Sequence, residues 1–148
     1  MPRPVAPRRS QSPMPSAPTA DRVLVDTSVW VDFFRNRSNA VALVAELAAT
    51  NRAVISGTVL QETLQGAKTE KELKFLRAQM SLWHFESEQP EDFVAAAALY
   101  AHLRWQGVTV PPADCLIAAV AIRSNAALCS SDAHFARMKG LQFHHLAP

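Results

Sequence analysis

The sequence predicts an α/β fold built around a mostly parallel sheet. From Val23 onward, short apolar runs alternate with longer segments of helical periodicity. The apolar runs are too short and too evenly separated for a helical bundle. Because helical segments connect successive strands, the strands would run parallel, with helices on both faces of the sheet. We therefore expect a doubly wound sheet of about five strands.

The first strand is predicted over residues 23–26, where three aliphatic residues precede an aspartate. A short helix over 28–35 follows, because its aromatic and aliphatic side chains, Trp30 and Phe33 among them, fall along one side. An Ala-rich segment over 39–50, with aliphatic residues at helical spacing, predicts the second helix.

The next repeat of the pattern begins with AVIS, a strand predicted over 53–56. A helix is predicted over 58–65, after Gly57, and an amphipathic helix over 69–80, in which leucines alternate with lysines. The apolar run LWHF predicts a third strand over 82–85.

Prolines mark the helices of the last part of the chain. One proline opens a long helix over 90–106, and a pair of prolines opens another over 113–124. ALCS predicts the fourth strand, over 127–130, and LQFHHL the fifth, over 141–146. Between these two strands lies a last short helix over 133–139, which ends at a glycine.

Length and composition predict one folded domain with a tail. A chain of 148 residues that is 49% hydrophobic can bury a single core, which we place in residues 21–148. Residues 1–20 hold six of the ten prolines and three arginines, so we expect a disordered tail. The tail arginines can contact nucleic acid, or the tail is a flexible extension or an over-long gene start before Met14.

Two further features concern the compartment. The longest apolar runs, such as residues 116–122, are far shorter than the roughly 18 residues of a membrane span, so we expect no membrane segment. Cys115 and Cys129 lie in apolar surroundings without metal-type spacing, so we expect them in the core of a cytoplasmic protein.

Four acidic residues fall at matching places in this pattern. Two of them lie at strand ends: Asp26 ends the first strand and Asp132 follows the fourth. The other two lie early in helices: Glu62 in the first turns of the helix after the second strand, and Asp114 in the first turn of the helix opened by the proline pair. In a parallel sheet these places lie along one edge, the carboxyl ends of the strands, where ligands bind. We expect the four carboxylates to converge there.

Each acid also has a simpler interpretation. Asp26 or Asp132 can cap the following helix, Asp114 can complement a helix dipole, and Glu62 can be a solvated glutamate. Four crowded carboxylates repel one another, however, unless a cation lies between them. With oxygen ligands only, and no Cys or His at ligand spacing, Mg²⁺ or Mn²⁺ is favoured over zinc.

Four stretches of the sequence together resemble the acidic motifs of PIN-domain ribonucleases. They are LVDTSVW (24–30), TVLQETLQGA (58–67), PPADCLIAAVA (111–121) and LCSSDAHF (128–135). Their order and spacing are most similar to the VapC-type toxins of prokaryotic toxin–antitoxin pairs, and the resemblance covers residues 22–147. It implies a three-layer α/β/α sandwich and Mg²⁺-dependent cleavage of RNA.

The resemblance also assigns roles to residues. Asp26, Glu62, Asp114 and Asp132 match the family's acidic quartet, so we expect the three aspartates to bind one or two ions, with Glu62 binding metal or positioning the attacking water. Ser28 and Ser130 match hydroxyl positions that orient these carboxylates. The family often has a further acid where this chain has His134. Three alternatives remain: weaker metal binding on that side, a histidine that supports a metal ligand or transfers a proton, or a surface histidine without a role.

RNA would need positive charge near this acidic edge. The candidates are Arg35, Arg37, the tail arginines and a basic group on one amphipathic segment, namely Lys68, Lys71, Lys74 and Arg77. An ordinary solvated helix face with interleaved glutamates explains the lysines equally well. The tryptophans Trp30, Trp83 and Trp105 are expected in the core.

For partners, the resemblance implies a homodimer and a cognate antitoxin whose tail crosses the acidic pocket, in addition to a tRNA or rRNA substrate. The apolar faces of residues 41–47 and 73–80 can serve these contacts or the core. Three alternatives to the toxin are a housekeeping PIN nuclease that processes RNA without an antitoxin, a non-catalytic PIN-fold binding module, and a phosphatase or receiver domain. The last is disfavoured because no Lys occupies the strand ends and no second acid follows Asp26.

Overall fold

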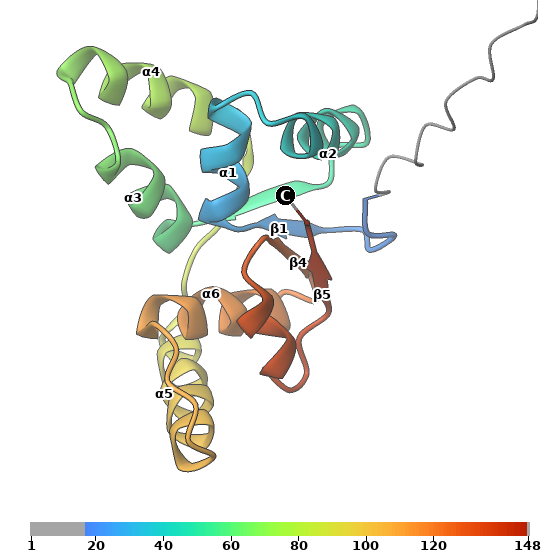
Figure 1. Ribbon diagram of the computed structural model, residues 1–148, viewed down its shortest axis with the longest axis vertical. Helices are drawn as coiled ribbons and strands as arrows, with labels where there is room; N and C mark the ends of the chain where they lie inside the picture. Colours follow the sequence, from blue (N-terminus) through green and yellow to red (C-terminus); the bar gives the residue numbers. More distant parts are fainter. Residues whose placement is uncertain (1–16, 148) are drawn as a thin grey trace, which may run out of the picture.

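A five-stranded parallel sheet forms the centre of the protein (Figure 1). The computed structural model describes residues 17–147. The strands are β1 (Val23–Val25), β2 (Ala53–Ser56), β3 (His84–Glu86), β4 (Ala127–Ser130) and β5 (Phe143–His145). They lie in the order β3-β2-β1-β4-β5, and every neighbouring pair is parallel. This confirms the predicted parallel sheet.

Helices cover both faces of the sheet, as predicted. They are α1 (Thr27–Phe34), α2 (Ser38–Ala49), α3 (Gly57–Gln65), α4 (Glu70–Met80), α5 (Pro90–Trp105), α6 (Pro112–Arg123) and the 3₁₀ helix η1 (Ala133–Arg137). Figure 1 shows α1 and α2 on one side of the sheet and α5 and α6 on the other, with α3 and α4 beyond the ends of the central strands. The layers form the α/β/α sandwich that the resemblance implied.

Strand β1 lies in the middle of the sheet, and all three of its residues are buried. The chain leaves β1 toward β2 on one side and later returns to β4 on the other. Such a change of direction opens a crevice at the carboxyl ends of the two diverging strands, which is where ligands bind in open α/β sheets. The residues that directly follow β1 and β4 therefore occupy the position best suited to a site.

Local sequence features explain where several helices begin and end. The hydroxyls of Ser56 and Thr69 accept hydrogen bonds from Val59 and Glu72 and so cap α3 and α4. Asn36, Asn51 and Asn125 follow α1, α2 and α6 with φ near +55°, a left-handed conformation that Asn tolerates better than most residues.

One buried charge network ties β3 and α5 to α6. Arg123, at the end of α6, donates from Nε to both carboxylate oxygens of Asp92, at 2.8 and 3.0 Å, and from Nη1 to Glu86 at 3.0 Å. Asp92 is only 1% exposed, and its charge is compensated by this guanidinium and by the backbone N–H of Gln89, which donates to Oδ2 at 2.8 Å.

Two expectations about apolar residues were wrong. The third strand begins at His84 rather than residue 82, because the apolar side chain of Trp83 packs on Trp30 of α1, with ring centroids 5.1 Å apart, while Leu82 is exposed in the preceding turn. Trp105 is 72% exposed at the end of α5, so it is not a core residue. The helical pattern placed it correctly on α5 but could not reveal that its side chain is exposed to solvent.

The tail predicted over residues 1–20 lies mostly outside the described residues, since 1–16 are not described. Ala17 is buried, and its backbone N–H donates to Glu46 at 3.2 Å. The guanidinium of Arg52 donates to the carbonyl oxygens of Pro18 and Ala20. Residues 17–20 therefore contact the domain. Cys115 and Cys129 are free and buried, as expected. In the described part of the chain, the helices are too short or too polar to cross a bilayer.

Candidate active site

All four predicted carboxylates lie at the carboxyl edge of the sheet. Asp26 directly follows β1, Asp132 follows Ser130 and Ser131 at the end of β4, Glu62 belongs to α3, and Asp114 lies in the first turn of α6. They are close enough to interact electrostatically: Asp26 and Asp132 repel Asp114, and Asp26 and Asp114 repel Glu62. Four segments that are distant in sequence thus place negative charge in one crevice.

Asp26 is the most firmly held of the four. The hydroxyls of Ser28 and Ser130 donate to its Oδ2 at 2.8 and 2.7 Å, and the residue is 3% exposed. Although Asp26 is the N-cap residue of α1, its side chain makes no capping hydrogen bond. Within residues 17–147, its Oδ1 accepts no hydrogen bond. The carboxylate is therefore oriented by two hydroxyls and keeps one oxygen for a further partner.

The same two hydroxyls also hold the loop that carries Asp132. The backbone N–H of Ser131 donates to Ser28 Oγ at 3.2 Å, and that of Asp132 donates to Ser130 Oγ at 3.0 Å. Each hydroxyl has one proton, which it donates to Asp26, and lone pairs that accept these N–H groups. Ser28 and Ser130 thereby couple the ends of β1 and β4.

Glu62 is positioned by Thr27, a contact that the sequence analysis missed. The Thr27 hydroxyl donates to Glu62 Oε1 at 3.0 Å. Burial raises the pKa of Glu62, the Thr27 hydrogen bond opposes this, and repulsion from Asp26 and Asp114 adds to it. The only sequence indication was the position of Thr27 directly after a predicted ligand, which does not reveal that its hydroxyl faces α3.

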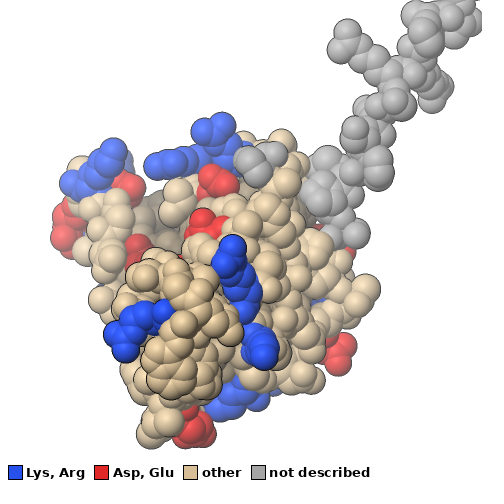
Figure 2. All heavy atoms as spheres, turned by 60° about the horizontal axis from the view of Figure 1, so that its bottom comes forward, with Lys and Arg blue, Asp and Glu red and all other residues tan. Residues whose placement is uncertain are grey.

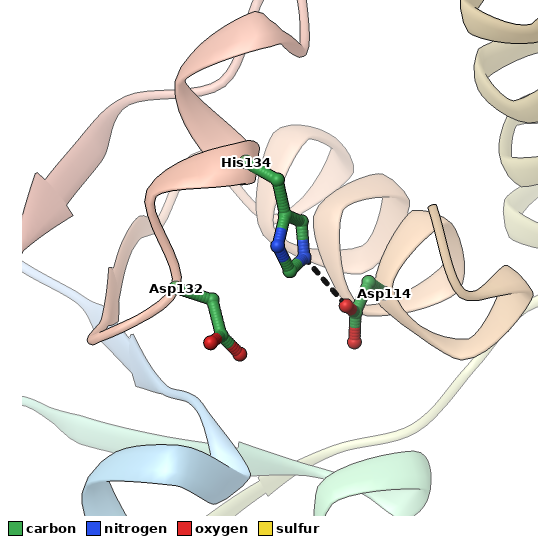
Figure 3. Close-up of side chains that lie close together, drawn as sticks. All are labelled: Asp114, Asp132 and His134. Atoms are coloured by element: carbon green, nitrogen blue, oxygen red, sulfur yellow. Dashed lines mark hydrogen bonds and ion pairs between the residues drawn. The ribbon is translucent and has the colours of Figure 1, made fainter. Parts of the chain in front are cut away.

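Asp114, Asp132 and His134 lie close together in the site (Figure 3). Each offers one ligand atom, and these atoms all lie within 4.8 Å of one another. His134 Nε2 lies 2.6 Å from Asp114 Oδ2, and its ring stacks on Phe135 with centroids 4.8 Å apart. Of the alternatives left open for His134, a surface position without a contact to the site is therefore not what the structure shows. Asp114 and His134 are twenty residues apart on different elements, and a sequence spacing could not bring them together.

The electrostatics of Asp114 favour a bound cation. Burial raises its pKa, the hydrogen bond with His134 opposes this, and repulsion from Asp26 and Asp132 raises it further. The charged form of this carboxyl is therefore less favourable than that of an ordinary aspartate. A divalent ion among these oxygens would offset both the repulsion and the burial, so the residues fit a metal site.

Positive charge around the site is dispersed. Lys68, Lys71, Lys74 and Arg77 are all exposed, on α4 or just before it, with glutamates between them. An open groove of about 530 Å³ separates α3 from α4 and is lined in part by Gln61, Lys68 and Leu73. Figure 2 shows Lys and Arg on one face in several separate groups, with Asp and Glu among them, rather than one continuous basic surface.

The apolar faces suggested for partner contacts are mostly occupied by the core. Leu43, Val44 and Leu47 of α2 and Leu76 and Met80 of α4 are buried. The large apolar side chains that remain exposed lie elsewhere or at the margins of these faces. They include Val41, Phe75, Leu82, Phe85, Phe93, Val94 and Trp105.

Comparison with known proteins gives a consistent result. Residues 23–141 match the family model of the PIN domain. Ribonuclease VapC11 of Mycobacterium tuberculosis is 37% identical over 130 residues, which cover 81% of this chain and 96% of that protein.

Two solved structures share the fold. The DNA-bound VapBC of Salmonella typhimurium superposes with a TM-score of 0.75 at 20% identity, covering 85% of this chain and 98% of that one. VapBC2 of Rickettsia felis, bound to a promoter DNA fragment, has a TM-score of 0.71 at 21% identity and covers 83% and 97% of the two chains.

Proposed function

Because the chain belongs to the PIN domain family and, within it, to the VapC ribonucleases, we propose that it is a metal-dependent endoribonuclease acting as the toxin of a toxin–antitoxin pair. Such an enzyme hydrolyses RNA phosphodiester bonds and stops growth until its antitoxin binds. The observation that carries the proposal is the convergence of Asp26, Glu62, Asp114 and Asp132, with Asp26 fixed by the hydroxyls of Ser28 and Ser130.

The residues that would hold the metal are Asp26, Asp114 and Asp132, with Glu62 as a further ligand or as the group that positions water. Mg²⁺ or Mn²⁺, one or two ions per site, suits these oxygens. A bound divalent ion offsets charge on the attacked phosphate and makes water more acidic near neutral pH.

The protein's own groups divide the remaining tasks. The Ser28 and Ser130 hydroxyls keep Asp26 in one orientation, so that its free oxygen is held in place before substrate arrives. Glu62, held by Thr27 and with a raised pKa, is suited to accept a proton from the attacking water. The partly buried crevice strengthens each of these interactions compared with bulk water.

For the substrate, Lys68 lines the groove between α3 and α4, while Lys71, Lys74 and Arg77 are exposed along α4. All four can contact RNA phosphates. Because glutamates are interleaved with them, the affinity for RNA backbone alone would be modest. A tRNA or a ribosomal RNA loop is the expected substrate of a toxin of this type.

For partners, we expect a cognate antitoxin and a homodimer, which together form a toxin–antitoxin hetero-oligomer. Exposed Phe75 and the other apolar side chains at the surface supply contact area that the core leaves unused. The antitoxin would block the acidic crevice, and a basic side chain would be the natural group to insert there.

The proposal is tested in two steps. First, expression of the protein should stop growth, and co-expression of the neighbouring antitoxin gene should restore it. Second, purified protein should cut total cellular RNA into discrete fragments with Mg²⁺ or Mn²⁺ and leave it intact with EDTA. Growth arrest without metal-dependent cleavage would refute the nuclease, and cleavage without growth arrest would favour the housekeeping enzyme.

A further inference from the structure

His134 occupies a place in the crevice that a carboxylate-only metal site does not explain. It lies on η1, two residues after Asp132, and its side chain is 31% exposed. Stacking on the fully buried Phe135 sets the plane of its ring. In Figure 3 the nitrogen-bearing edge of the ring points toward the space between Asp132 and Asp114.

The distances within this cluster suit a single ion. One carboxylate oxygen each of Asp114 and Asp132 and one ring nitrogen of His134 lie within 4.8 Å of one another. Ligands on opposite sides of a small divalent ion are about 4.2 Å apart, since each lies about 2.1 Å from the metal. Small side-chain rotations would therefore bring two oxygens and one nitrogen into a common coordination sphere. The hydrogen bond that now joins His134 Nε2 to Asp114 Oδ2 would be replaced by two bonds to the ion.

We propose that His134 is a nitrogen ligand of the divalent metal and that it makes this site prefer Mn²⁺ to Mg²⁺. The inference rests on the proposed function, because it assigns the ion of the same active site. Imidazole is a good ligand for first-row transition ions, whereas Mg²⁺ takes oxygen ligands and holds its waters tightly. One imidazole added to the aspartate ligands thus raises the affinity for Mn²⁺ relative to Mg²⁺ above that of an all-oxygen site.

The alternative is that His134 only orients Asp114 by hydrogen bonding, without touching the ion. An orienting residue would affect both ions similarly, because it changes the position of a shared oxygen ligand. A nitrogen ligand would affect Mn²⁺ more than Mg²⁺. The two roles therefore predict different changes in the ratio of Mn²⁺ to Mg²⁺ affinity when His134 is replaced. A loss of activity alone would not distinguish them.

The direct test is electron spin-echo spectroscopy of the full-length protein loaded with Mn²⁺. We expect a nitrogen coupling typical of a coordinated imidazole in the wild type, and its loss in His134→Asp. His84→Gln is the matched control, since His84 lies at the start of β3, at the opposite edge of the sheet, and should leave the coupling unchanged. Comparing the wild-type spectrum with and without ¹⁵N-labelled histidine tests whether the coupled nitrogen belongs to a histidine. This comparison does not depend on the folding of any variant.

Competition titrations of Mn²⁺ against Mg²⁺ provide the second readout. His134→Ala should lower the Mn²⁺ affinity about tenfold or more and the Mg²⁺ affinity less, and His134→Asp should reduce the Mn²⁺ preference. A Mn²⁺-loaded wild type without nitrogen coupling would overturn the inference and leave the proposed function standing. Equal losses of Mn²⁺ and Mg²⁺ affinity in His134→Ala would likewise overturn the inference and leave the proposed function standing. A wild type that binds neither ion would overturn both.

Discussion

Ser130 Oγ donates a 2.7 Å hydrogen bond to Asp26 Oδ2 across 104 residues of sequence. This bond joins the end of β4 to the end of β1, at the point where the order of the strands changes direction. Because the Ser130 hydroxyl also accepts the N–H of Asp132, one small side chain fixes the geometry of two predicted metal ligands.

Replacing Ser130 with alanine should therefore impair the site without unfolding the protein. We expect metal affinity or RNA cleavage to fall about 10- to 100-fold, as is usual when a group that orients a metal ligand is removed. The matched control is Ser131→Ala, since the neighbouring hydroxyl bonds to none of the described residues. Metal titration and cleavage rates measure the difference, and equal behaviour of the two variants would contradict the assigned role.

The carboxylates of the site should destabilise the metal-free protein. The pKa values of Asp114 and Glu62 are raised above their ordinary values of 3.8 and 4.5. Between the ordinary and the raised values the folded state binds more protons than the unfolded state, so the free energy of unfolding falls as the pH rises through this window. At neutral pH the free energy of unfolding therefore remains lower than it would be with ordinary pKa values for these two carboxyls.

Asp114→Asn should accordingly raise the melting temperature of the metal-free protein at pH 7, since the amide retains an oxygen for His134 and carries no charge. Mn²⁺ should stabilise the wild type much more than this variant. Asp21→Asn, an exposed carboxylate outside the site, serves as the control. Thermal unfolding with and without metal gives the answer, and a lower melting temperature for metal-free Asp114→Asn would refute the electrostatic explanation.

The Arg123 network should contribute to stability rather than to activity. Arg123→Met leaves the buried Asp92 carboxylate without its guanidinium, which we expect to cost about 1–3 kcal/mol of unfolding free energy. For a domain of this size that is a drop of several degrees in melting temperature. Arg35→Met, which removes an exposed arginine without an ion pair in the described chain, should change stability little. Urea titrations of both variants compare them, and similar midpoints would contradict the prediction.

The two thiols should be unreactive in the folded protein. Burial, with a smaller effect of Asp26, raises the pKa of Cys129 to about 12, and burial followed by repulsion from Asp114 raises that of Cys115. At pH 8 both remain neutral, so iodoacetamide should modify them only after unfolding. Above pH 9 the unfolded thiols ionise while folded Cys129, with its pKa of about 12, stays protonated, and stability should fall. Rapid labelling of native protein, measured by mass spectrometry, would contradict this.

Much of this arrangement is predictable from the sequence, because the positions of strands and helices along the chain follow from local patterns. AVIS and ALCS formed strands at the predicted residues, and the acids that end strands or begin helices met at one edge. Leu82 and Trp105 were placed wrongly, since apolar character alone does not distinguish packing on a neighbouring helix from exposure.

The contacts of Thr27 and His134 are a different case. They depend on how α3 and α6 approach the strand ends. The distances from these helices to the strand ends are set by tertiary packing. They cannot be predicted from sequence periodicity or residue spacing.

The central claim is that Asp26 is a metal ligand of a ribonuclease site, and cleavage of RNA by matched variants tests it most directly. Asp26→Asn keeps the size of the side chain and can still accept from Ser28 and Ser130, while Asp32→Asn makes the same change on α1, away from the strand end. With Mn²⁺ and total cellular RNA, we expect Asp32→Asn to cut like the wild type and Asp26→Asn to lose at least about 100-fold in rate. Wild-type cleavage by folded Asp26→Asn would contradict the account.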